Sequence, residues 1–326
     1  MTGDVLRTGY LDELLRFKDQ DVIKVVTGMR RCGKSTLLKQ FIELLKNNGT
    51  PDSNILYYNM ESVRNDRYRD GTTLYNEIVA KQDLGRLYII LDEVQYIEKW
   101  ERIVNSLRID IDCDIYITGS NAYLLSTEIS TLLTGRNIEI RVLPLSFREF
   151  SSIQYDTDDR YELFLRYVHL GGMPFIRPEY DEDAIFQRLD EIKSDIILKD
   201  ICNRKERIDS VKVRKVIDYM FSEIGNAISA GNIAENLKIS SSTSSDYLSL
   251  VTDSLLFNRV ERYDLKGRTI LKTDGEYYCA DIGMRNTQPL KADRDSGKIL
   301  ENIVYLELRR RGYKVYVGAI THIPHP

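Results

Sequence analysis

The segment that most constrains the fold of this chain is Gly28-Met29-Arg30-Arg31-Cys32-Gly33-Lys34-Ser35, which matches the pattern G-x-x-x-x-G-K-[ST] without deviation. A β-branched apolar run, 21–27, precedes the segment, and a run with helical periodicity, 34–47, follows it. A strand, a glycine-bounded turn and a helix in this order direct consecutive backbone N–H groups toward a phosphate group. The sequence therefore predicts a phosphate-binding loop (P-loop).

Strand-like and helix-like segments alternate through the first 145 residues. Four further strand-like segments are 54–60, 86–91, 114–118 and 137–143. This alternation predicts an α/β fold in which a parallel sheet is covered by helices on both faces. Such a sheet binds ligands at the carboxyl ends of its strands.

The loop predicts a site for ATP and Mg²⁺. Gly28 and Gly33 allow the backbone to approach the phosphates, Lys34 would bridge the β- and γ-phosphates, and the hydroxyl of Ser35 would bind the metal. The residues predicted to bind the nucleotide are Gly28, Met29, Arg30, Arg31, Cys32, Gly33, Lys34, Ser35 and Thr36.

Two carboxylates follow the apolar run 87–91. Asp92 is predicted to be the second protein partner of Mg²⁺. Glu93 is placed to orient or deprotonate an attacking water molecule. An Asp-Glu pair at this place favours a water-activating ATPase over the many P-loop kinases, whose nucleophile belongs to a second substrate.

A further strand ends in Thr118-Gly119-Ser120-Asn121. Ser120 and Asn121 are predicted to lie between the water and the γ-phosphate. Arg136 opens the next strand and is a candidate arginine finger, acting within one subunit or between subunits. The predicted catalytic set is therefore Lys34, Glu93, Ser120, Asn121 and Arg136.

The pattern changes after Pro144. Residues 145–201 are helical and acidic, and they precede three helical segments, 211–225, 232–237 and 246–254, and two strands, 256–263 and 269–273. Three helices followed by a hairpin is the order of a winged helix-turn-helix. In that arrangement hydroxyls from the second helix of the turn and two basic residues of the wing would face DNA: Ser241, Ser242, Thr243, Ser245, Lys266 and Arg268.

Two observations bear on DNA binding. Residues 201–326 carry 20 Lys and Arg against 16 Asp and Glu, a mild excess of positive charge. No Arg, Asn or Gln lies between Ser240 and Leu250, so any contact with double-stranded DNA would be mostly to phosphates. The alternative is that this region is a lid or a protein-docking module.

Composition excludes several other classes. Hydrophobic residues make up 42% of the chain and charged residues 29%, and no run approaches the ~18 to 20 apolar residues of a membrane span. The four cysteines include no C-x-x-C, which argues against a zinc cluster or a disulfide framework. We therefore expect a cytoplasmic protein with no membrane association.

Several strings together resemble prokaryotic AAA-type ATPases that pair an AAA_14 domain with a DUF4143 region. They are GMRRCGKST (28–36), LYIILDEVQ (87–95), ITGSN (117–121), LLTGR (132–136), LPLSFREF (143–150), LGGMP (170–174), SDIILKDI (194–201), EYYCADIGMRN (276–286) and GKILENIVYLELRRRGYKVY (297–316). Met29 stands where a proline is common in that family.

The resemblance implies four regions: an ATPase core over 1–150, a helical lid over 151–203, a winged helix over 204–275 and a nuclease-like α/β segment over 276–326. In a complete nuclease segment an acid on the first helix, here Glu301, would be followed by further metal-binding carboxylates. No Asp or Glu follows Glu307. We therefore expect a truncated or degenerate segment without nuclease activity.

These observations predict a Mg²⁺-dependent AAA-type ATPase whose nucleotide state moves its C-terminal region on DNA, on a protein partner or within a homo-oligomer. Two alternatives remain open. One is a nucleotide-binding switch with negligible hydrolysis, and the other is a P-loop kinase or transferase.

Overall fold

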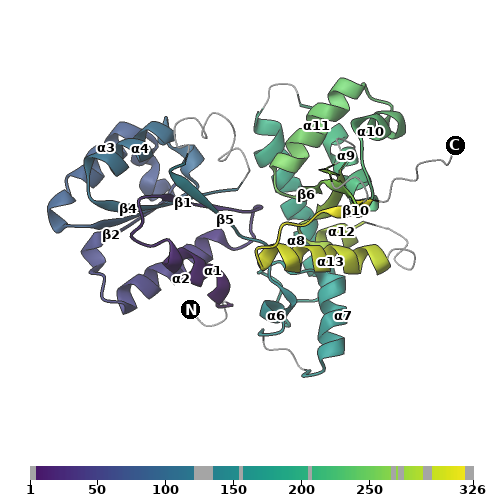
Figure 1. The fold of residues 1–326 in the computed structure, drawn as a ribbon, viewed down its shortest axis with the longest axis horizontal. Helices are drawn as coiled ribbons and strands as arrows, with labels where there is room; N and C mark the ends of the chain where they lie inside the picture. Colours follow the sequence, from purple (N-terminus) through teal and green to yellow (C-terminus); the bar gives the residue numbers. More distant parts are fainter. Residues whose placement is uncertain are drawn as a thin grey trace. The chain divides into compact units, whose positions relative to one another are not determined.

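The computed structural model describes residues 5–120, 135–153, 157–204, 208–265, 269–270, 275–288 and 296–319. The chain divides into two compact units, Met1–Val142 and Leu143–Pro326 (Figure 1). Each unit contains a hydrophobic cluster of its own.

The first unit is built on one parallel sheet. Its strands are β1 (Ile23–Thr27), β2 (Ile55–Asn59), β3 (Leu87–Asp92), β4 (Cys113–Gly119) and β5 (Asn137–Arg141). They lie in the order β2-β3-β4-β1-β5, and every neighbouring pair is parallel. The carboxyl ends of β1, β3 and β4 therefore meet at one edge, where the phosphate-binding loop begins.

Helices cover both faces of this sheet (Figure 1). They are α1 (Thr8–Arg16), α2 (Lys34–Asn47), α3 (Gly71–Val79) and α4 (Trp100–Asp110), and short helical turns lie at η1 (Asp52–Asn54), η2 (Val63–Arg69), η3 (Gln82–Leu84) and η4 (Val94–Tyr96). The apolar side chains of α3 and α4 pack with those of one sheet face. On the α2 face, the rings of Phe41 and Tyr116 lie 4.8 Å apart between their centroids.

The predicted α/β fold class is confirmed for this unit. The five predicted strands end within two residues of the observed ones, and the predicted helix 34–47 coincides with α2. The agreement follows from burial: all side chains of β1 and β3 are buried, as expected for strands covered on both faces.

The second unit is mostly helical. Its helices are α6 (Phe147–Phe150), α7 (Arg160–Leu170), α8 (Glu182–Asp195), the π-helix η6 (Ile196–Ile201), the turn η7 (Cys202–Arg204), α9 (Ser210–Ser222), α10 (Ala230–Leu237), α11 (Ser241–Asp253), α12 (Ile282–Asn286) and α13 (Ser296–Arg310). Its strands are β6 (Phe257–Val260), β7 (Arg262–Asp264), β8 (Thr269–Ile270), β9 (Glu276–Cys279) and β10 (Val317–Ala319).

Two details of this unit differ from the sequence-based expectation. The serine-rich stretch is part of α11, because Ser240 caps the helix by accepting a hydrogen bond from the N–H of Thr243. The predicted strand 256–263 is two strands: β6 pairs with β9, whereas β7 pairs with β8 and β10. The hairpin that follows the three helices is thus formed by β7 and β8.

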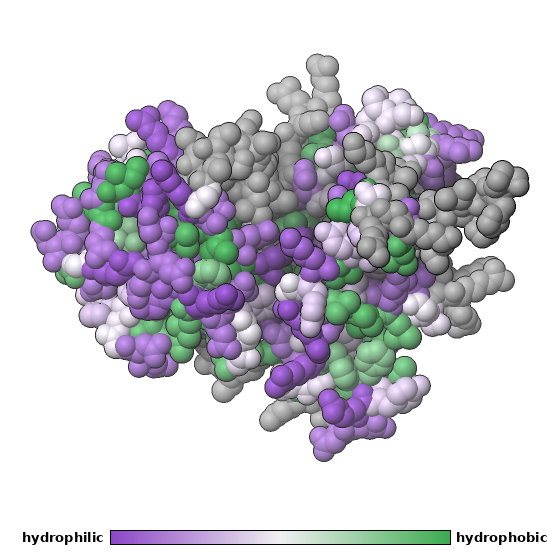
Figure 2. All heavy atoms as spheres, in the orientation of Figure 1, coloured by the Kyte–Doolittle hydropathy of each residue, from purple (hydrophilic) through white to green (hydrophobic). Residues whose placement is uncertain are grey.

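No helix among the described ranges combines the length and the apolar character needed to cross a bilayer. The face drawn in Figure 2 mixes hydrophilic and hydrophobic residues, and its hydrophobic residues gather most visibly near α7 and α13.

Candidate active site

The loop between β1 and α2 has a glycine near each end. Gly28 has a φ of +152°, and a Cβ there would lie 2.3 Å from the carbonyl oxygen of Val142. Gly33 has a φ of +104° and is the N-cap of α2. Side chains disfavour both backbone conformations, and Gly28 has no space for one. Gly28 therefore lets the loop lie against the segment that follows β5, and Gly33 lets the chain turn into α2.

The N-terminus of α2 carries backbone N–H groups that no side chain caps. The first N–H groups of a helix have no acceptor within the helix. The first turn of α2 contains no acidic residue, and Ser35 and Thr36 are half-buried there. These donors lie at the positive end of the helix dipole, which suits an anion such as a phosphate group.

Two of the predicted loop residues contribute packing rather than an accessible side chain. Met29 and Cys32 are both buried. The Sγ of Cys32 lies 3.3 Å from the carbonyl oxygen of Val142, and burial raises the pKa of its thiol. Their part in binding a nucleotide would therefore be through backbone N–H groups.

The two loop arginines differ in exposure. Arg30 is largely buried, and one guanidinium nitrogen lies 3.5 Å from Oε1 of Glu61. Arg31 is exposed and has a φ of +64°, a conformation that non-glycine residues rarely adopt. Arg31 is thus the loop side chain most open to solvent.

Lys34 is almost fully buried within the loop. Its Nζ donates hydrogen bonds to the carbonyl oxygens of Gly28 at 2.9 Å and Met29 at 3.3 Å. The same ammonium lies 3.8 Å from Oε1 of Glu93. Phosphate oxygens would compete with these neutral carbonyls for the ammonium, and hydrogen bonds between charged groups are the stronger ones.

The carboxylate of Asp92 is fully buried at the end of β3, where three neutral groups donate to it. Oδ1 accepts a hydrogen bond from the hydroxyl of Thr118 at 2.6 Å. Oδ2 accepts from the phenol of Tyr57 at 2.8 Å and from Nδ2 of Asn59 at 3.1 Å. These donors come from β2 and β4, so both neighbouring strands fix the carboxylate.

The pKa of Tyr57 is raised, first by burial and then by the charge of Asp92. The phenol therefore keeps its proton at neutral pH and remains a donor to the Asp92 carboxylate.

Glu93 turns away from the line of β3. Its φ of +59° is unusual for a non-glycine residue, and such conformations cost about 1–3 kcal/mol where the surroundings impose them. Its N–H donates to the hydroxyl of Thr118 at 2.8 Å, and its Oε2 accepts from Nε2 of Gln95 at 2.6 Å. The turn brings the carboxylate of Glu93 beside the ammonium of Lys34.

Sequence reasoning missed Thr118. The strand end Thr118–Asn121 was singled out for Ser120 and Asn121, but the hydroxyl of Thr118 connects Asp92 and Glu93. Ser120 is buried at the end of β4, and Asn121 lies outside the described residues. The signal in the sequence was that Thr118 carries a hydroxyl near the carboxyl end of β4, the strand that pairs with β3. The predicted role of Ser120 and Asn121 near the γ-phosphate remains untested.

Arg136 lies at the amino ends of the strands, whereas the loop lies at their carboxyl ends. β1 and β5 are parallel with Ile23 opposite Asn137, so Arg136 precedes the amino end of β5. The N–H of Ile23 donates to the carbonyl oxygen of Arg136 at 2.8 Å, and the arginine side chain is exposed. The length of β1, about 13 Å at ~3.3 Å per residue, separates this arginine from the loop of its own chain. This separation favours action between subunits over action within one subunit, and the finger role of Arg136 stays a prediction.

The residues at this edge fit a magnesium nucleotide. The glycine-bounded loop and the uncapped start of α2 offer donors for phosphate, and Asp92 has no ion pair within the described part of the chain. Mg²⁺ in proteins commonly binds one or two carboxylates, substrate phosphates and several waters. Asp92 and the hydroxyl of Ser35 are the groups that would hold it.

The residues considered for DNA contact lie in the second unit. Ser241, Ser242 and Ser245 are exposed on α11, whereas the neighbouring Ser244 is buried and donates to the carbonyl oxygen of Ala230 on α10. Thr243 is half-buried. The two wing residues considered, Lys266 and Arg268, lie outside the described residues. The exposed hydroxyls are thus on the outer side of α11.

Glu301 lies on α13, where its Oε1 accepts a hydrogen bond from the phenol of Tyr278 at 2.7 Å. In the parts of the chain that the structure describes, no three His, Cys, Asp or Glu side chains gather as metal ligands.

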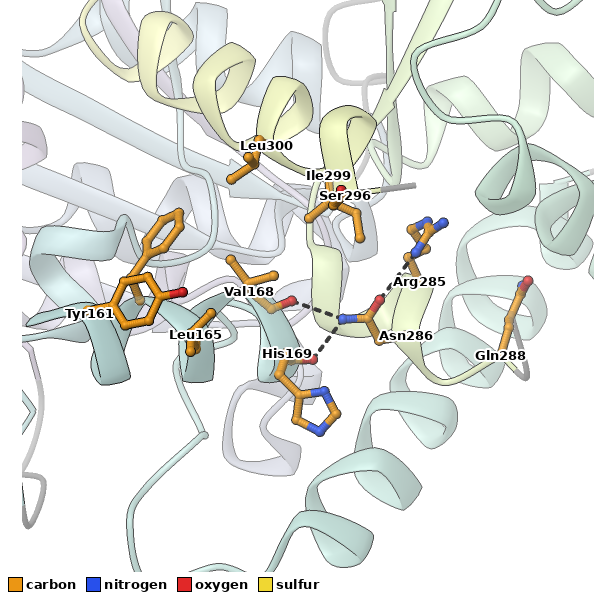
Figure 3. A pocket seen from close by; sticks show the side chains of 11 residues that line it. Tyr161, Leu165, Val168, His169, Arg285, Asn286, Gln288, Ser296, Ile299 and Leu300 are labelled. Atoms are coloured by element: carbon orange, nitrogen blue, oxygen red, sulfur yellow. Dashed lines mark hydrogen bonds between the residues drawn. The ribbon is translucent and has the colours of Figure 1, made fainter. Parts of the chain in front are cut away.

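A separate cavity of about 450 Å³ lies in the second unit between α7, α12 and α13 (Figure 3). Apolar side chains, including Leu165 and Ile299, form much of its wall. At its polar end, Nδ2 of Asn286 donates to the carbonyl oxygens of Val168 and His169, which ties α12 to the last turn of α7. The cavity is mostly apolar and is not part of the nucleotide site.

The fold and the loop together define a P-loop NTPase. The family model AAA_14, described as an AAA domain, matches residues 20–151. The chain is 38% identical to an uncharacterized protein of Haemophilus influenzae, over 97% of this chain and 81% of that protein. The chain therefore belongs to the AAA-type P-loop ATPase family represented by these matches.

Other relatives and solved structures are similar as well. The uncharacterized protein MJ1544 of Methanocaldococcus jannaschii is 33% identical over 89% of this chain and 67% of its own length. The Aeropyrum pernix Orc1 protein in complex with DNA is similar with a TM-score of 0.36 and 14% identity, covering 95% of each chain. The replication initiator DnaA bound to AMPPCP and single-stranded DNA is similar with a TM-score of 0.32 and 17% identity, covering 77% of this chain and 89% of the DnaA chain.

The expected DUF4143 region is not the one that matches. Residues 161–295 match DUF8612, a domain of unknown function, which runs from α7 past α12. This single match crosses the expected boundaries at 203 and 275, so the division into lid, winged helix and nuclease-like segment remains a prediction. The strings after residue 160 were individually too short to separate one such family from another.

Proposed function

We propose that this chain binds ATP with Mg²⁺ at residues Gly28–Thr36 and hydrolyses the bond between the β- and γ-phosphates. The observation that supports this most directly is the convergence of Lys34, Asp92 and Glu93 at one sheet edge. The ammonium of Lys34 lies 3.8 Å from Glu93, and the hydroxyl of Thr118 bonds both acidic residues.

Binding would use the loop. The uncapped N–H groups of α2 would donate to phosphate oxygens, and Lys34 would exchange the carbonyl oxygens of Gly28 and Met29 for the β- and γ-phosphates. Mg²⁺, bound through Ser35 and Asp92, would supply neutralisation of the charge that develops on the phosphates. The hydrogen bonds to Asp92 would keep its carboxylate in one orientation.

Hydrolysis would use Glu93 as the general base. Its carboxylate lies next to the loop and would accept a proton from the attacking water. Ser120 and Asn121 are proposed to contact the γ-phosphate or the water from the end of β4. Arg136 is proposed to act only on a nucleotide bound by a neighbouring subunit.

Steady-state phosphate release from Mg·ATP tests this proposal. Lys34→Ala should abolish both binding and release, and Glu93→Gln should retain binding while lowering release by about 10²-fold or more. Lys39→Ala and Glu43→Gln, on exposed positions of the same helix α2, are matched controls. Tight binding without release in the unmodified chain would indicate the switch alternative. Phosphate on an acceptor instead of free phosphate would indicate a kinase or transferase.

We further propose that hydrolysis is coupled to movement of the second unit on double-stranded DNA or a protein partner. The order α9, α10, α11 and the β7–β8 hairpin supports this, together with the exposed hydroxyls of α11. Ser241→Asp with Ser245→Asp would repel DNA phosphates, so it should remove any stimulation of phosphate release by DNA. Ser222→Asp, at the end of α9, is the control. Stimulation that persists in the double variant would contradict contact through α11.

A further inference from the structure

We propose that Gln95 is a positioning residue of the hydrolytic site, which holds Glu93 with its amide nitrogen and the attacking water with its amide oxygen. This inference rests on the proposed ATP hydrolysis. Gln95 belongs to the turn η4, directly after the pair Asp92–Glu93.

The charge of Glu93 determines which way the amide of Gln95 faces. The nitrogen Nε2 lies 2.6 Å from Oε2 of Glu93. A carboxylate can only accept hydrogen bonds, so the atom that faces it must be the NH₂ group. The opposite orientation would place two acceptors in contact. The amide oxygen Oε1 is therefore not the atom that contacts this oxygen of Glu93.

That amide oxygen is a buried acceptor without a partner. Within the described ranges, Oε1 of Gln95 accepts no hydrogen bond. Leaving a buried acceptor unpaired destabilises a folded protein, so such atoms usually have a function or an ordered water. This atom belongs to the same amide group that contacts the catalytic-type carboxylate.

An attacking water molecule needs two acceptors to be fixed in orientation. One proton would go to Glu93, and the other would be held by Oε1 of Gln95. The water oxygen forms the new bond to the γ-phosphorus while the bond from that phosphorus to the bridging oxygen breaks, and the bridging oxygen leaves with the electron pair on ADP. Glu93 takes the first proton, and the second remains on the phosphate product.

The second effect of Gln95 is on Glu93 itself. Among the described side chains, Gln95 and Lys34 are the donors that contact the Glu93 carboxylate. Without the bond from Nε2 of Gln95, the 3.8 Å contact with the ammonium of Lys34 would be the one that remains. Lys34 is also the residue proposed to move to the phosphates. Gln95 would therefore keep the carboxylate in place when Lys34 leaves it.

The test is single-turnover hydrolysis of Mg·ATP with protein in excess, for the unmodified chain, Gln95→Leu, Glu93→Gln and the double variant. If Gln95→Leu does not fold, Gln95→Met takes its place, because it also removes the amide nitrogen and oxygen but has a more flexible side chain. Gln187→Leu is the matched control, because Nε2 of Gln187 donates to Glu191 on the exposed face of α8. Melting temperature and the Kd for Mg·ATP are measured on every variant.

We expect Gln95→Leu to lower the hydrolysis rate about 10- to 100-fold with the Kd changed less than about twofold, and we expect no further loss in the Glu93→Gln background. A rate equal to that of the unmodified chain would overturn the inference. An equal fractional loss in both backgrounds would also overturn it, because it would indicate a general structural effect. Absence of hydrolysis in the unmodified chain would overturn the proposed function and this inference together.

Discussion

At the scale of single residues, one hydroxyl group connects the two carboxylates of the site. The oxygen of Thr118 donates to Asp92 and accepts from the N–H of Glu93. It therefore orients the predicted metal ligand and the unusual backbone of the predicted base at once. A residue of the same shape without a hydroxyl would remove both contacts.

Thr118→Val should destabilise the first unit by about 1–3 kcal/mol, because two buried groups lose their partner. It should also lower ATP hydrolysis, since Asp92 and Glu93 would each lose one of the hydrogen bonds that orient them. Urea denaturation and phosphate release measure the two effects. Thr252→Val, which removes only a bond to the preceding turn of α11, is the control. Unchanged stability and an unchanged hydrolysis rate would contradict the role of Thr118 in orienting Asp92 and Glu93.

Gly28→Ala should weaken Mg·ATP binding by an order of magnitude or more and lower the stability of the first unit. The new Cβ would lie 2.3 Å from the carbonyl oxygen of Val142 and would require a positive φ. Isothermal calorimetry and thermal unfolding measure both effects. Gly9→Ala in α1 is the control, because a Cβ at Gly9 meets no atom within 4 Å. Gly9→Ala should be neutral or stabilising by up to about 1 kcal/mol. If Gly28→Ala binds Mg·ATP as tightly as the unmodified chain, the close approach of Gly28 to Val142 is not needed for binding.

Residue roles could be predicted only in part. The loop Gly28–Ser35 can be recognised from the spacing of its residues, and the pair Asp92–Glu93 from its position after an apolar run. Tyr57, Gln95 and Thr118 do not, because their importance arises from the register of neighbouring strands and from one turn. The position of Arg136 could have been predicted from the sequence, because a residue that opens a strand of a parallel sheet lies at the amino end of that strand, away from the loop.

At the scale of elements, burial decided what could be predicted. Strands β1 and β3 are buried on both faces and read as apolar runs. The other three strands of the first unit, which are less completely buried, were predicted as well. The strands of the second unit are shorter and partly exposed, and β8 has only two residues. The break between β6 and β7 was therefore not visible in the sequence, since the two strands join different sheets.

The N-cap of α12 gives an element-scale prediction about pH. Asp281 is buried, and its carboxylate accepts hydrogen bonds from the N–H groups of Gly172 at 2.7 Å and Met284 at 3.1 Å. Burial raises the pKa of Asp281 from its ordinary 3.8 to about 6. The folded chain thus binds more protons than the unfolded chain between these values. The contribution of Asp281 to stability is greatest below about pH 4 and decreases as the pH rises through about 6.

We therefore expect the free energy of unfolding of the unmodified chain, relative to Asp281→Asn, to fall by up to about 3 kcal/mol between pH 4 and 7. Denaturant unfolding across this range measures it. Asp70→Asn, at the exposed N-cap of α3, should give the opposite slope at the acidic end of this range and below it, because a hydrogen bond from the Thr73 side chain lowers the pKa of Asp70 from its ordinary 3.8. A difference for Asp281→Asn that stays constant with pH would refute the assignment.

At the scale of the whole molecule, the parallel direction of the strands places the predicted site residues at two opposite ends of the sheet. The carboxyl edge carries the loop, Asp92 and Glu93, and Arg136 lies at the amino edge. An arginine finger at that place acts only if a second chain brings it to another nucleotide. Catalysis assisted by Arg136 therefore implies an oligomer.

Arg136→Ala should leave the Kd for Mg·ATP of each chain unchanged while lowering the hydrolysis rate per chain at high protein concentration. In the unmodified chain the rate per chain should rise with concentration, and in the variant it should stay flat. Arg108→Ala, on α4 of the same unit, is a control for loss of a partly exposed arginine. A rate per chain independent of concentration in both proteins would show that Arg136 is not a finger.

The proposed function requires that one end of the sheet both binds ATP and hydrolyses it. The most direct test mixes excess protein with Mg·ATP for a single turnover and quantifies protein-bound nucleotide and free phosphate in the same sample, for the unmodified chain and Glu93→Gln. We expect ADP and phosphate from the unmodified chain and bound, intact ATP from Glu93→Gln. Intact ATP on both proteins, or ATP bound by neither, would contradict it.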